Sequence, residues 1–308
     1  MATLPADEAS NNYAFEAFWD RTGYHAEMNV SRILAVYGHP DDEGQVTGTL
    51  AHFIANGATV TLVCATRGEV GEISDPTLAT QETLWYTREL ELRASMAQIG
   101  LGDVRFLPFR DSGMAGTTEN EDPRCLHQQP APVVVEALVR IIREVRPEYV
   151  FTWDPTGGYG HPDHVAVHKH TVEAFDASGN AEAYPESGPA WAPERLYWGS
   201  RGMKQFASIF LEMEKRGMLP EPMAPDRKAL FEKAMLDPDP PVSVVHDVSQ
   251  YIPVKRLAAS MHRSQFGENS MFARIPEDMR ARFYGQERFF QARPEWPSAT
   301  DPAQGFDN

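Results

Sequence analysis

The chain has 308 residues, 42% hydrophobic and 23% charged, which is enough for one large or two modest globular domains. Its formal net charge of -16 disfavours nucleic acid and anionic lipid, because proteins bind both mainly through Lys and Arg. The sequence has neither a signal-like start nor a bilayer-length apolar run, so we expect a cytoplasmic protein without membrane insertion.

Strand-like and helix-like segments alternate through the first half of the chain. In chain order we expect a strand at 32–38, a helix at 45–56, a strand at 58–66, a helix at 78–99, a strand at 104–109, a helix from Pro132 and a strand at 148–153. Such alternation predicts an α/β fold: a Rossmann-like, mostly parallel sheet flanked by helices.

The rest of the chain is organised differently. Residues 1–30 are expected to be an N-terminal extension and 31–308 a single domain, with a catalytic core to about 200 and a mostly helical C-terminal appendage at 201–308. Within it, 241–248 (PVSVVHDV) is strand-like. The methionines between Gly202 and Pro241 favour core packing over an acyl-chain pocket.

The first charged motif, AVYGHPDDE, follows the first strand. It places His39, Asp41, Asp42 and Glu43 just beyond a strand end, where parallel α/β sheets line their ligand crevice. Carboxylates that only start a helix would explain one or two of the acids, but neither the histidine nor the rigid Pro40.

A second motif, GGYGHPDH, follows the strand at 148–153. It places His161, Asp163 and His164 at another strand end on the same sheet edge. A catalytic zinc takes three N or O ligands and keeps one open position, so two imidazoles and a carboxylate from these turns would suffice. The remaining acid and imidazole could then act as base and acid.

These motifs resemble those of the LmbE-like, or PIG-L, family of zinc-dependent N-acetylglucosamine deacetylases. TRGE (66–69), RELELRASMAQIGLGDVRFLPFRDSGM (88–114) and HRSQ (262–265) extend the resemblance. It implies a hydrolase that removes an N-acetyl group from an amino-sugar small molecule or glycoconjugate.

The resemblance also implies residue roles. The metal ligands would be His39, Asp42 and His164. Asp41 would be the general base, and His161 would stabilise the oxyanion or protonate the amine with Asp163 as its partner. Zinc is the expected metal, although such a ligand set also suits ferrous iron.

Other positions are expected to contact substrate or to be structural. Arg67, Asp111 and Tyr159 are the candidate substrate contacts, each with a structural ion pair or packing as the alternative. His168 shares a helix face with His164 and is the alternative third ligand. Glu43 is expected to be a helix-start charge, and His262 with Gln265 to pack the appendage on the core.

Other functions remain open at this stage. An amidase that cleaves a different acyl group would use the same chemistry, and a binding protein of the same fold would need neither Asp41 nor His161. A dinucleotide enzyme lacks its GxGxxG after the first strand, and a dinuclear phosphoesterase would need more ligands. A homo-oligomer is left open.

Overall fold

The computed structural model describes residues 30–200, 203–219, 221–267, 270, 272, 274–297 and 301–306. The expected N-terminal extension lies outside the described residues, apart from Val30.

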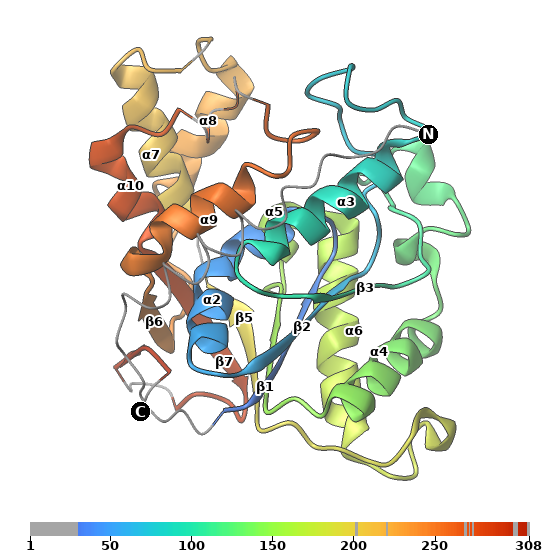
Figure 1. Ribbon diagram of the computed structural model, residues 1–308. Helices are drawn as coiled ribbons and strands as arrows, with labels where there is room; N and C mark the ends of the chain where they lie inside the picture. The colour runs from blue at the N-terminus through green and yellow to red at the C-terminus, as the bar shows by residue number, and fades with distance from the viewer. Residues whose placement is uncertain are drawn as a thin grey trace, which may run out of the picture.

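An eight-stranded sheet, counted over the described residues, forms the centre of the fold in the order β3-β2-β1-β4-β5-β7-β6-β8 (Figure 1). The strands are β1 Arg32–Tyr37, β2 Thr59–Cys64, β3 Asp103–Phe106, β4 Tyr149–Thr152, β5 Arg195–Gly199, β6 Val244–Asp247, β7 Gln286–Arg293 and β8 Ala303–Gln304. The first five strands pair in parallel, whereas β7 runs antiparallel to both of its neighbours. The predicted α/β fold with a mostly parallel sheet is confirmed.

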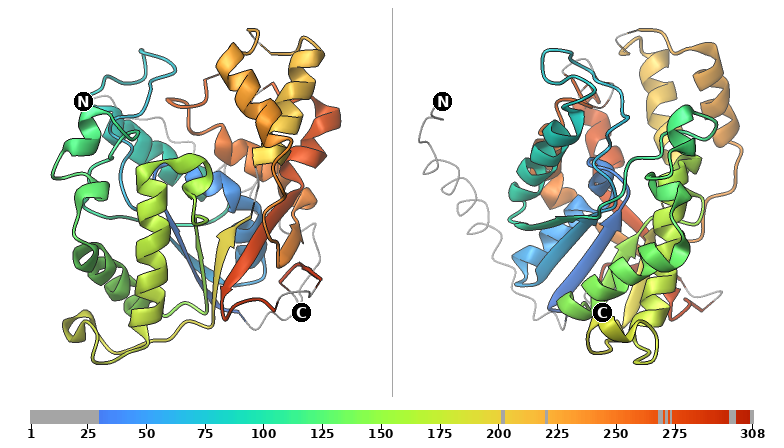
Figure 2. Two further views of the ribbon diagram at one scale, coloured as in Figure 1. Left: turned by 180° about the vertical axis from the view of Figure 1, so that it is seen from behind. Right: turned by 90° about the vertical axis from the view of Figure 1, so that its right-hand side faces the viewer.

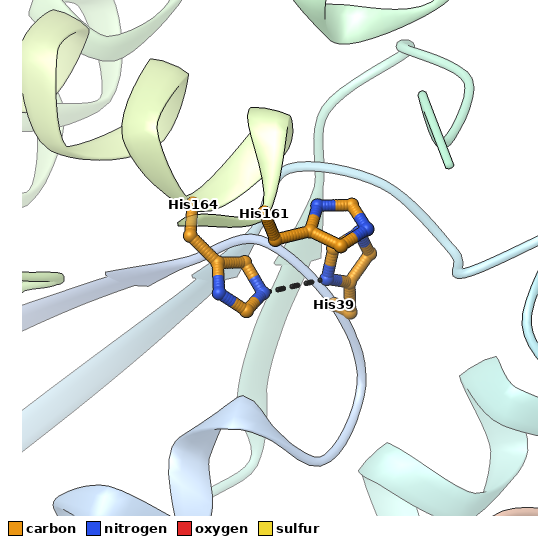
Figure 3. A group of neighbouring side chains, drawn as sticks. All are labelled: His39, His161 and His164. Atoms are coloured by element: carbon orange, nitrogen blue, oxygen red, sulfur yellow. Dashed lines mark hydrogen bonds between the residues drawn. The ribbon is translucent and has the colours of Figure 1, made fainter. Parts of the chain in front are cut away.

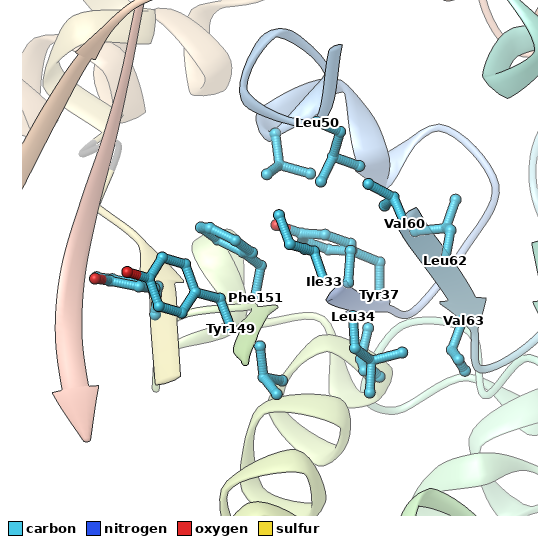
Figure 4. Packing of buried hydrophobic residues seen from close by; sticks show 14 of the residues in the cluster. Ile33, Leu34, Tyr37, Leu50, Val60, Leu62, Val63, Tyr149 and Phe151 are labelled. Carbon is cyan, nitrogen blue, oxygen red and sulfur yellow. The ribbon is translucent and has the colours of Figure 1, made fainter. Parts of the chain in front are cut away.

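The central strands are apolar because both faces of the sheet are covered. All residues of β1 from Ile33 to Tyr37 are buried, as expected for a parallel strand between helical layers. In Figure 4, Leu50 and the ring of Phe151 meet the side chains of β1 within one continuous core.

Helices cover the two faces of the sheet (Figure 2). α2 Thr47–Ala55 and α3 Leu84–Ala97 lie on one face, and α4 Ala131–Val145 and α6 Pro162–Ser178 lie on the other. α9 Ile252–Ala259 packs against α2 and α3. α3 begins six residues later than the helix expected from residue 78.

The C-terminal part differs from the expected mostly helical appendage. α7 Met203–Lys215, α8 Pro225–Ala234 and α10 Glu277–Tyr284 form a helical group with its own core, in which Met213 and Met223 are buried. However, β6, β7 and β8 extend the main sheet, and β7 pairs with β5. The single domain over 31–308 stays a prediction, which this continuous sheet supports.

Candidate active site

Two turns that follow neighbouring strands bring the charged motifs together. β1 and β4 pair in parallel, with Ala35 opposite Phe151, so both strands end at the same edge of the sheet. His39 follows β1, while His161 and His164 lie where α6 begins after β4. Figure 3 shows the three imidazoles converging from these two turns.

The three side chains expected to bind a metal form a compact, buried triangle. Nδ1 of His39 lies 3.0 Å from Nε2 of His164. Oδ2 of Asp42 lies 3.7 Å from the first nitrogen and 3.3 Å from the second. Two ligands about 2.0–2.1 Å from a tetrahedral zinc ion lie about 3.3 Å apart, so the donor set and its spacing fit one such ion.

The hydrogen bonds of the two rings assign their tautomers. Nδ1 of His164 lies 3.1 Å from the carbonyl oxygen of Gly157, and Nε2 of His39 lies 3.1 Å from Oδ2 of Asp163. Each of these nitrogens donates, since a carbonyl or carboxylate oxygen can only accept. Nδ1 of His39 and Nε2 of His164 are therefore the nitrogens that face each other, and once both rings are neutral, as metal binding requires, each would offer its lone pair to the ion.

The Asp42 carboxylate is held from three directions. Its Oδ2 accepts the N–H groups of Gly38 at 3.0 Å and His39 at 2.8 Å, and the indole N–H of Trp153 at 3.2 Å. Although burial opposes ionisation, the imidazoles of His164 and His39 hold the pKa of Asp42 well below its usual range. The carboxylate is therefore charged and fixed beside the two rings.

Two overlapping groups offer other ways to hold a metal. They are His39 with His161 and His164, and His39 with Asp111 and Asp163, with ligand atoms within 4.8 Å of one another. His39 is common to these groups and to the expected set.

Asp41 lies next to this cluster in an unusual backbone conformation. Its φ of 101° is in the left-handed region, just before the short helix η1 Asp42–Gln45. Its Oδ2 accepts a hydrogen bond from Nη2 of Arg88 at 3.2 Å. Burial raises the pKa of Asp41 to about 6, although the Arg88 guanidinium opposes the rise. The carboxylate is thus more basic than an exposed one yet ionised at neutral pH.

His161 is the N-cap residue of α6 and is held in one tautomer. Its Nδ1 accepts the backbone N–H of Asp163 at 3.2 Å. Burial, and then the neighbouring rings of His39 and His164, lower its pKa to about 4. The neutral ring therefore carries its proton on Nε2, the nitrogen free to serve as a donor.

Asp163 does not orient His161 as expected. Its carboxylate accepts from His39 and from both the backbone N–H and the hydroxyl of Ser112. This difference arises because the side chain leaves the first turn of α6 toward the β1 turn, so only its backbone N–H reaches His161. A carboxylate on the far nitrogen of a metal-binding histidine is a common arrangement.

Of the three expected substrate contacts, Asp111 and Tyr159 lie beside the histidine cluster, whereas Arg67 forms an ion pair elsewhere. Oδ1 of Asp111 lies 3.4 Å from Nε2 of His39. The ring of Tyr159 lies 5.3 Å from that of His164, and the side chain is 60% exposed. Arg67 instead pairs with Glu89 at 2.8 Å, so its contact with substrate stays a prediction that this ion pair does not favour.

Sequence reasoning missed several residues that support the cluster. Arg88, Ser112 and Trp153 touch Asp41, Asp163 and Asp42 respectively. Arg88 and Ser112 lie in segments that carried the family resemblance, but spacing alone did not single them out. His168 points elsewhere, because its Nδ1 bonds the carbonyl oxygen of Trp153.

Two imidazole nitrogens 3.0 Å apart, a charged carboxylate and a second carboxylate beside them at the strand ends of an α/β sheet are typical of metal-dependent hydrolases. None of the helices in the described ranges is long and apolar enough to cross a membrane.

Comparison with known proteins narrows this class. Residues 34–175 match the family described as GlcNAc-PI de-N-acetylase, PIG-L. The chain is 38% identical over 250 residues to a 1D-myo-inositol 2-acetamido-2-deoxy-alpha-D-glucopyranoside deacetylase of Rhodococcus jostii, covering 77% of this chain and 82% of that protein. The enzyme of the same name from Thermobifida fusca is 37% identical over 248 residues, covering 77% of this chain and 84% of that protein. The chain belongs to the PIG-L family, and the predicted family is confirmed.

Solved structures show the same fold. The N,N'-diacetylchitobiose deacetylase of Pyrococcus horikoshii has a TM-score of 0.61 at 18% identity, covering 94% of both chains. A 4-carboxy-2-hydroxymuconate hydratase from Pseudomonas putida has a TM-score of 0.57 at 17% identity, covering 88% of this chain and 98% of that chain. Because this fold also carries a hydratase, the reaction must be argued from the site.

Proposed function

We propose that this protein removes the acetyl group from an N-acetylglucosaminide whose second part is a small polar alcohol such as an inositol. The observation that carries the proposal is the close approach of Nδ1 of His39 and Nε2 of His164, 3.0 Å apart beside the charged Asp42. The sequence relatives add the substrate class, since they are named as deacetylases of an acetamido sugar linked to inositol.

His39, Asp42 and His164 would hold the metal, with zinc as the expected ion and ferrous iron as the alternative. When bound, the metal supplies positive charge that lowers the pKa of water and polarises the amide carbonyl. Ser112 and Asp163 support this role by fixing the orientation of His39.

Asp41 is the base of the reaction. Its carboxylate, with a pKa of about 6, takes a proton from the attacking water at neutral pH. The water oxygen then bonds to the amide carbonyl carbon, and the carbonyl oxygen takes up the negative charge. Arg88 keeps the carboxylate in place through its 3.2 Å contact.

His161 stabilises the oxyanion. Its Nε2–H donates to the developing negative charge, and loss of one such donor typically costs about 10²- to 10³-fold in rate. The proton that Asp41 took from the water passes to the amine nitrogen as the C–N bond breaks, which returns Asp41 to its ionised form and leaves the neutral ring of His161 unchanged. Acetate and a free amino sugar are the products.

Two residues beside the cluster are proposed to contact the substrate. Asp111 and Tyr159 flank the histidine cluster and are the proposed contacts to the sugar. The side chain of Tyr159 is 60% exposed beside the cluster, which suits a residue that contacts a bound substrate. A cytoplasmic location and the oligomeric state stay predictions.

The test is a comparison of substrates with the zinc-loaded protein. Release of primary amine is measured from an α-linked N-acetylglucosaminyl inositol, from N,N'-diacetylchitobiose, from free N-acetylglucosamine and from the N-butyryl analogue of the first. We expect the highest kcat/KM for the acetylated inositol glycoside. Preference for the butyryl analogue would favour the amidase alternative, and metal binding without release from any compound would favour a binding protein.

A further inference from the structure

The backbone of Asp41 is held in its left-handed conformation by a neighbouring carboxylate. The Asp41 N–H donates to Oε2 of Glu43 at 2.8 Å. A non-glycine residue at a φ of 101° persists only where its surroundings enforce that conformation. Glu43 therefore does more than place a charge at a helix start, the role expected from the sequence.

Glu43 is itself fixed by two other parts of the chain. Its Oε1 accepts from Nε2 of His262 at 2.5 Å and from the hydroxyl of Ser95 at 2.9 Å. Both Glu43 and His262 are almost completely buried, at 2% and 1% exposure. One carboxylate thus connects the Asp41 backbone, α3 and a residue 219 positions farther along the chain.

The contact of His262 is made through one nitrogen. Its Nδ1 has no hydrogen-bond partner among the described residues. The contact with Glu43 therefore needs a hydrogen-bond donor at the position of Nε2. It needs none at the position of Nδ1. This asymmetry allows a side-chain amide to replace the ring.

A second contact from the C-terminal part holds the next element. Glu287 of β7 accepts the N–H groups of Gly48 at 2.9 Å and Thr49 at 2.8 Å in the first turn of α2. The segment from the base to α2 is therefore tied to the C-terminal part at both of its ends.

We propose that His262 is a positioning residue for catalysis, acting through Glu43 to hold the backbone of Asp41 and so to aim the base. The inference rests on the proposed function for its kinetic effect, but not for its structural effect. The Asp41 carboxylate must lie within hydrogen-bond reach of the attacking water, and a shift of about 1 Å can cost on the order of 10²-fold in rate.

The kinetic test replaces His262 with two amide side chains of different length. The His262→Gln substitution places an amide N–H near the position of Nε2, whereas His262→Asn places it near Nδ1. We expect His262→Asn and His262→Leu to lower kcat by about 10- to 100-fold with unchanged KM and metal content, and His262→Gln to recover most of kcat. Ser95→Ala, which leaves one of the two donors to Oε1, should give a smaller loss.

A second readout works even if no substrate is found. Hydrogen exchange of the peptide covering 38–44 should be slow in the wild type and in His262→Gln, and faster in His262→Asn and Ser95→Ala. His170→Leu, which removes a buried imidazole elsewhere, is the control and should not change it. Equal exchange in all variants would overturn the positioning role, whereas slow wild-type exchange without amine release would count against the proposed function alone.

Discussion

The guanidinium of Arg88 lies against both the side chain and the backbone of the Asp41 turn. Nη2 donates to Oδ2 of Asp41 at 3.2 Å and also to the carbonyl oxygen of Pro40, while Nη1 donates to the carbonyl oxygen of Gly68 at 3.1 Å. The arginine thus ties the turn after β1 to the turn after β2, and it carries the positive charge that opposes the rise in the pKa of Asp41.

Substituting Arg88 with lysine should therefore impair catalysis despite keeping the charge. The three contacts are made from two nitrogens, Nη1 and Nη2, and the single nitrogen of a lysine side chain cannot occupy both positions. We expect a loss of about tenfold or more in kcat with unchanged metal content, measured by amine release and metal analysis. Arg93→Lys is the matched control, because Arg93 lies on the same helix but contacts Glu89 and Val104. Similar losses in both variants would contradict this role.

Gly157 should not tolerate a side chain. Its φ is +64°, and a Cβ there would lie 2.7 Å from Cβ of His164. Gly160→Ala is a close control, with a φ of +88° and open space around the added carbon. Both variants bear a backbone cost of roughly 1–2 kcal/mol. Gly157→Ala should in addition lower the metal content, because the added carbon displaces His164. Thermal unfolding measures the loss of stability in both variants, and metal analysis measures the loss of metal.

The third metal ligand can be tested with two histidines on one helix. His164→Ala should bind zinc at least about tenfold more weakly, because it removes one of the two facing imidazole nitrogens. His168→Ala should bind it normally, because His168 bonds the carbonyl oxygen of Trp153 instead. Zinc titration after treatment with a chelator measures both. Weaker binding in His168→Ala alone would reverse the assignment.

The pH dependence of stability should include a contribution from His170. Burial lowers the pKa of this histidine below 6.5 in the folded state. Between the folded value and 6.5, the unfolded chain binds more protons, so stability falls as pH decreases below about 6.5. Urea unfolding from pH 7.5 to 5 should show a shallower decline for His170→Gln than for the wild type. Parallel curves would contradict the assignment.

The alternating first half of the chain could be predicted well because its signals are local. Continuous apolar runs such as β1 and β2 reflect burial on both faces, and the expected strand at 148–153 contains β4. In contrast, β7 was missed within a region expected to be mostly helical. Its sequence, QERFFQAR, carries charges at both ends, and its strand conformation depends on pairing with β5 and β6 far away in the chain.

The site likewise has a part that local sequence predicts and a part that it does not. The two His-Pro-Asp turns are local motifs, so their residues and meeting place could be predicted. The partners inside the site depend on side-chain direction and on contacts between distant segments, which spacing does not encode. The pairing of Asp163 with His39 and that of Glu43 with His262 are of this kind.

The role of Asp41 as the base is tested most directly by comparing the zinc-loaded wild type with Asp41→Asn. Both proteins are assayed for amine release from the acetylated inositol glycoside at pH 7.5, above the pKa of about 6 for Asp41, and for bound zinc. We expect one zinc per chain in both, with amine release by the wild type and a loss of at least about 10²-fold in the variant. Equal release by both proteins would show that Asp41 is not the base.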